Sequence, residues 1–97
     1  MYSIDSTIRT QEFKKLQVNK LAKTDAYEIL SISLEKDAIF PEHTSPTDAQ
    51  LIVLEGEIDF HINGESYPLG AYQHFDFPKA TKHWVIAKVN AKFLIVR

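Results

Sequence analysis

The sequence predicts an all-β fold, a sandwich or a barrel, from three observations. Apolar and polar residues alternate with a period of two along several short runs, as they do in strands with one buried face. Asn63-Gly64 separates two of these runs, and both residues tolerate the positive φ of a tight hairpin turn. No run shows the longer periodicity of an extended helix. Short strands at regular spacing are typical of closed or two-layered β folds.

Length and composition set the scale of the molecule. The chain has 97 residues, of which 44% are hydrophobic and 25% charged, and these values suit one small globular domain. We therefore expect a single domain over residues 1–97, with an N-terminal arm over 1–18 and a barrel over 26–97.

Charge and residue content exclude several classes of function. The net charge is −2 and no basic stripe is present, so we expect no nucleic-acid partner. The absence of cysteine excludes disulfides, thiolate nucleophiles and cysteine-based metal sites. No signal peptide and no membrane-spanning run is present, so we expect a cytoplasmic protein without a membrane partner.

Residues 1–19 carry the weakest pattern in the chain. Thr10 could cap a short helical turn that places Phe13 and Leu16 on one face. An extended arm fits the same residues, so both conformations stay open.

The rest of the chain divides into strands that are separated by turn residues. In the run 27–34, Leu30, Ile32 and Leu34 share one face, which we expect to be buried. The run 57–62 alternates in the same way after a break at Gly56. The expected strands cover residues 18–22, 27–34, 38–41, 49–54, 57–62, 65–69, 74–77, 83–88 and 92–97.

Two motifs in these runs resemble those of the cupins. The first cupin motif is Gly, five residues, His-x-His, three or four residues, Glu, six residues, Gly. Here Asp37 takes the first glycine, His43 the first histidine, Ser45 the second histidine, Ala49 the glutamate and Gly56 the last glycine. The spacing is kept while three of the five identities are lost.

The second cupin motif is Gly, five residues, Pro-x-Gly, two residues, His, three residues, Asn. In this chain Tyr72 and Ala80 replace the two glycines, Ala87 replaces the asparagine, and Pro78 and His83 match. The resemblance covers roughly residues 28–96. It implies a jelly-roll barrel, also called a double-stranded β-helix, with His43 and His83 on its inner wall.

The missing motif residues weaken any metal site. The resemblance implies three histidines and one carboxylate as metal ligands, and only His43 and His83 are kept. Asp48 could supply a carboxylate, although strand alternation points it away from the face of Ala49. Two imidazoles make a weak and unselective site for Zn, Fe, Ni or Mn. We therefore predict a barrel without a strongly held metal. The alternative is a metal-dependent isomerase or dioxygenase that uses His43 and His83.

The predicted activity is the binding of a small molecule at the barrel mouth. The candidate contacts are His43, His83, Ser45, Phe75 and Phe77. A buried Phe stabilises the fold by about 2–3 kcal/mol, so a chain of this length can spare few aromatic residues and its cavity should be small. We expect the two remaining histidines, 61 and 74, to face solvent.

Apolar residues on outward faces predict a homodimer. Trp84 and Ile86 lie two residues apart on the outward face of one predicted strand. Ile52 and Leu54 lie in the same way on the outward face of another. The cupin resemblance implies dimerisation too, often with an exchanged N-terminal strand. The alternative is that the N-terminal arm of the same chain covers one outer face.

Overall fold

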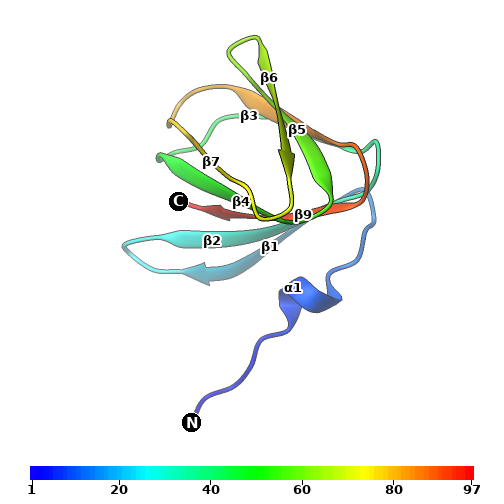
Figure 1. The fold of residues 1–97 in the computed structure, drawn as a ribbon. Helices are drawn as coiled ribbons and strands as arrows, with labels where there is room; N and C mark the ends of the chain where they lie inside the picture. Colours follow the sequence, from blue (N-terminus) through cyan, green and yellow to red (C-terminus); the bar gives the residue numbers. More distant parts are fainter.

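The computed structural model describes residues 1–97 and contains nine β-strands and one short helix (Figure 1). The elements are α1 (Thr7–Thr10), β1 (Leu16–Lys23), β2 (Glu28–Leu34), β3 (Ile39–His43), β4 (Ala49–Glu55), β5 (Glu57–Ile62), β6 (Glu65–Gly70), β7 (His74–Phe77), β8 (His83–Ala87) and β9 (Ala91–Val96). The predicted all-β class is confirmed. The four-residue helix is the only one, and no helix is long enough to span a membrane.

The strands form two antiparallel sheets that enclose one core. The larger sheet has the order β1-β2-β9-β4-β7 and the smaller one has the order β3-β8-β5-β6. Sixteen buried apolar residues fill the space between them, and they include all six of the predicted inward residues in β2 and β5. Apart from the pairs β1-β2 and β5-β6, neighbouring strands are not consecutive in the chain, as in a jelly roll.

We predicted an N-terminal arm over residues 1–18, and in the structure residues 1–15 precede β1. The first residues lie away from the barrel, and the chain then runs across the outside of the larger sheet (Figure 1). A helical turn starting at Thr10 is wrong, because α1 ends at that residue. Beyond it, Gln11 exchanges hydrogen bonds with Ser31 of β2, and Lys92 of β9 donates to the carbonyls of Ile8 and Arg9. These contacts hold the arm extended, and they cover part of this outer face from within the same chain.

Four motif positions share one backbone conformation. Asp37, Tyr72 and Ala80 have φ values of 69°, 69° and 59°, and Gly56 has 79°. All four lie in the left-handed region that favours glycine. The three non-glycine residues each donate their backbone N–H to a carbonyl of another segment, at distances of 2.7–2.9 Å. These turns therefore adopt the conformation that favours glycine, although three of the four residues are not glycine.

Candidate functional site

A cavity of about 260 Å³ lies at one mouth of the barrel, between the two sheets. The larger sheet contributes apolar side chains from β1, β2 and β9, and the smaller sheet contributes residues of β3 and β8. The lining residues are Val18, Leu30, Ile32, Phe40, His43, Thr44, Ser45, Pro46, Phe77, His83, Ile95 and Arg97. This volume is below the usual range of drug-sized sites, so the cavity suits a small molecule.

The antiparallel pairing of β3 with β8 brings His43 opposite His83. Their Nε2 atoms lie 3.1 Å apart. The Nδ1 atom of His43 lies 2.6 Å from the carbonyl oxygen of Pro41, and that of His83 lies 2.9 Å from the carbonyl oxygen of Thr81. A carbonyl oxygen only accepts, so each Nδ1 carries a hydrogen. The two Nε2 atoms then face each other and the cavity.

Aromatic rings enclose the two imidazoles. Phe40 stacks on His43 with a centroid distance of 4.3 Å, and Phe77 and Phe60 pack on His83 at 4.5 and 5.3 Å. His83 is 3% exposed. Burial lowers the pKa of His83, the hydrogen bond to Thr81 opposes that shift, and the nearby charges of His43 and Arg97 lower the pKa further. The environment therefore favours the neutral imidazole.

The other predicted contacts divide between the cavity and the core. Ser45 lines the cavity, but its hydroxyl donates to the carbonyl oxygen of Thr47 at 2.7 Å. Phe77 lines the cavity as well. Phe75 does not: it is half-buried and packs on Phe60 and Tyr67.

Comparison with known proteins gives the family. A profile described as a cupin domain matches residues 30–97. This chain belongs to the cupin family. No curated protein matches its sequence.

Solved cupin structures share the fold at low sequence identity. A conserved protein of unknown function from Streptococcus pyogenes is 25% identical with a TM-score of 0.83, over 98% of this chain and 84% of the other. A cupin superfamily protein from Desulfitobacterium hafniense is 17% identical with a TM-score of 0.86, over 99% and 90%. An RmlC-like cupin from Desulfovibrio desulfuricans is 20% identical with a TM-score of 0.86, over 99% and 95%.

The residues of this cupin fit a tightly held metal ion poorly. The two Nε2 atoms are close enough to reach one ion at the usual bond length of about 2.0–2.1 Å. No group of three His, Cys, Asp or Glu residues is placed to hold it. Asp48 is not brought to the pair, because its Oδ1 accepts from the backbone N–H of Lys79 at 2.9 Å. Ala49, at the glutamate position, is buried and offers no donor atom.

Sequence reasoning missed one charged residue of this cavity. Arg97 follows β9 and lines the mouth. Arg97 follows the buried residues Phe93 and Ile95 at intervals of two. The alternation of β9 could therefore have placed Arg97 on the inner face of the sheet.

The surface histidines take no part in the site. His61 lies on the outer face of the smaller sheet, half-buried, and stacks on Trp84 at 3.7 Å. His74 is exposed on the larger sheet, where it is hydrogen-bonded to Gln50.

Proposed function

We propose that this cupin binds a small molecule in the mouth cavity, with the Nε2 atoms of His43 and His83 as its polar contacts and without a strongly held metal. One observation carries the proposal. Both Nδ1 atoms are committed to backbone carbonyls, while both Nε2 atoms converge in a cavity with a mainly apolar wall. Two facing lone pairs repel each other until a proton or another electropositive group lies beside them.

The shape of the site supports a ligand rather than plain core. Side chains of an ordinary core interdigitate and leave few voids larger than one water molecule. This cavity has the volume of roughly nine waters at about 30 Å³ each. Apolar walls with a few convergent polar groups are typical of small-molecule sites.

The test is a fragment panel of neutral, anionic and cationic molecules, with binding followed by saturation-transfer NMR. We expect at least one fragment to bind the wild type and to lose binding in the His43→Ala, His83→Ala double variant. The matched control is His61→Ala with His74→Ala, which removes two imidazoles from outside the cavity. Equal binding by the two double variants would contradict the proposal. His43→Gln and His83→Gln keep more of the side-chain volume should the alanine variant fold poorly.

A second candidate function is metal-dependent catalysis of the isomerase or dioxygenase type. The observation that favours it is the 3.1 Å separation of the two Nε2 atoms, each held in place through its Nδ1 by a backbone carbonyl. Plasma mass spectrometry on untagged protein decides between the candidates. Near-stoichiometric metal that disappears in His43→Ala, His83→Ala, and stays in the surface double variant, would replace the metal-free proposal with this one.

A further inference from the structure

The charged side chains around the mouth cavity are mainly positive. No acidic side chain lines the cavity, whereas the basic residue Arg97 does. The chain as a whole carries a net charge of −2, so this distribution is local. The nature of the ligand can be inferred from this imbalance, given the binding function proposed above.

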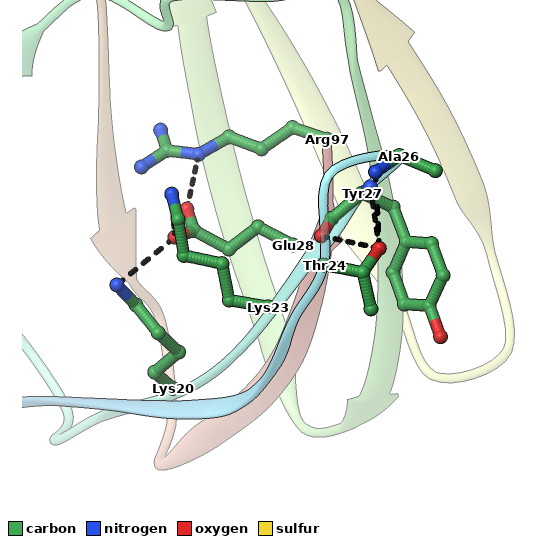
Figure 2. Close-up of polar contacts among 7 residues, drawn as sticks. All are labelled: Lys20, Lys23, Thr24, Ala26, Tyr27, Glu28 and Arg97. Carbon is green, nitrogen blue, oxygen red and sulfur yellow. Dashed lines mark hydrogen bonds and ion pairs between the residues drawn. The ribbon is translucent and has the colours of Figure 1, made fainter.

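Three cations converge beside the mouth on a single carboxylate (Figure 2). The Glu28 carboxylate is 2.9 Å from Nε of Arg97, 3.1 Å from Nζ of Lys20 and 3.5 Å from Nζ of Lys23. Among the side chains of this group, positive charges therefore exceed negative ones by two. Asp25 in the adjoining turn makes no ion pair with any of them.

Strand register turns this cluster toward the inside of the barrel. Lys20 pairs with Leu30 and Lys23 pairs with Glu28, so both lysines share the face of the buried β2 residues. Arg97 exchanges two backbone hydrogen bonds with Glu28, which places its side chain on that face too. The basic residues thus extend the inner wall of the larger sheet, opposite the histidines of the smaller sheet.

Arg97 has donors to spare. It uses Nε toward Glu28, and its two Nη atoms have no partner in the protein. In Figure 2 these two atoms point away from Glu28. A guanidinium edge with free donors matches the two oxygens of a carboxylate.

We infer that the ligand of this cavity is a small hydroxy carboxylate with an apolar body. The carboxylate pairs with Arg97, a hydroxyl donates to the Nε2 atom of His43 or His83, and the apolar body packs on the wall of β1, β2 and β9. A neutral or cationic molecule would leave the two Nη groups of Arg97 without an anionic acceptor. Arg97 is then a specificity-determining residue.

Three probes of nearly the same shape separate these features in isothermal titration calorimetry. Mandelate carries the carboxylate and the hydroxyl, mandelamide lacks the charge, and phenylacetate lacks the hydroxyl. We expect mandelate to bind about tenfold more tightly than mandelamide, because a charge-assisted hydrogen bond is lost in the amide. Phenylacetate should bind more weakly than mandelate.

Two variants break the same ion pair and have opposite expected effects. Arg97→Gln removes the ligand's charge partner, so it should weaken mandelate binding by about tenfold. Glu28→Gln removes the carboxylate that competes for Arg97, so it should strengthen mandelate binding. Neither variant should change mandelamide binding. A loss of mandelate affinity in both variants would show that the pair only supports the structure, and would overturn the inference.

The remaining outcomes distinguish a failure of the carboxylate inference from a failure of the proposed binding function. If neutral fragments bind through His43 and His83 while mandelate and phenylacetate do not, the binding function stands and the carboxylate inference fails. If no fragment of any charge binds through the two histidines, both fail. Arg9→Gln, which removes an exposed charge from the arm, is the control for net charge and should leave mandelate affinity unchanged.

Discussion

At the scale of single residues, Ala80 and Tyr72 have a left-handed backbone where the cupin motifs have glycine. Side chains in this region cost about 1–2 kcal/mol relative to the right-handed region. Ala80 is exposed and its N–H donates to the carbonyl oxygen of Ser45, so the strain is held by the loop and not by side-chain packing.

The substitution Ala80→Gly should therefore raise the free energy of unfolding by about 0.5–1 kcal/mol, after the entropic cost of glycine in the unfolded chain is subtracted. The control is Ala71→Gly. Ala71 is exposed and lies outside the left-handed region, so this substitution should lower the free energy of unfolding. Urea denaturation measures both. A loss of stability in Ala80→Gly would contradict the assigned backbone strain.

His43 and His83 could be predicted because the cupin motif fixes their spacing even where its other residues are replaced. The fate of Asp48 could not, because it depends on a hydrogen bond to Lys79, which lies in a loop 31 residues later. Strand period alone puts Phe75 and Phe77 on the same inner face. Phe77 is buried at the cavity and Phe75 is half-buried away from it, a difference that depends on how the two sheets close and that no local pattern specifies.

At the scale of elements, Gly56 joins β4 to β5 and combines a φ of 79° with a close neighbour. A Cβ at this position would lie 2.2 Å from the carbonyl oxygen of Asn90, which belongs to the turn before β9. Gly64, in the hairpin between β5 and β6, has a φ of 74°, and a Cβ there would meet nothing within 4 Å.

The variant Gly56→Ala should lower the free energy of unfolding by roughly 3 kcal/mol, since it adds a backbone clash to the conformational strain. Gly64→Ala should lower the free energy of unfolding by about 1 kcal/mol, because it adds conformational strain without a clash. Thermal or urea unfolding of the pair checks both values. Equal losses would show that β9 does not approach Gly56 as closely as the structure has it.

The ends of β1, β2 and β9 are joined through Glu28. Hydrogen bonds from Arg97 and then from Lys20 lower the pKa of this carboxyl to about 2, from an ordinary value of 4.5. A carboxyl with a depressed pKa stabilises the fold above its unfolded pKa, and this stability is lost as the pH falls through the folded value.

Between pH 4.5 and 2 the free energy of unfolding should therefore fall less steeply in Glu28→Gln than in the wild type. Denaturant titrations at several pH values give the two slopes. Glu12→Gln, which removes the carboxylate of an exposed ion pair, is the control for loss of one charge. Identical slopes for Glu28→Gln and the wild type would refute the coupling between these three strands.

At the scale of the whole molecule, the all-β class and most strands followed from alternation, because each strand buries one face against a common core. The order of strands in the two sheets did not follow, since pairings such as β2 with β9 join distant segments. The four residues predicted for a dimer are divided by this topology. Trp84 and Ile86 lie on the smaller sheet, and Ile52 and Leu54 lie on the larger one.

We still expect a homodimer, and we expect it to form through the smaller sheet because the arm already covers part of the larger one. Light scattering after size exclusion should give about twice the 11.1 kDa chain mass. Trp84→Lys should give a monomer and Ile52→Lys should not. A monomeric wild type would contradict the dimer, and the reverse result for the two variants would move the interface to the larger sheet.

The most direct test of the proposed site is the long-range 1H–15N spectrum of the four imidazoles while mandelate is added. Binding in the mouth predicts that the Nε2 signals of His43 and His83 shift with saturable dose dependence, while those of His61 and His74 stay in place. Signals of His43 and His83 that stay unchanged at saturating mandelate, or shifts confined to the surface histidines, would contradict a ligand site between the two sheets.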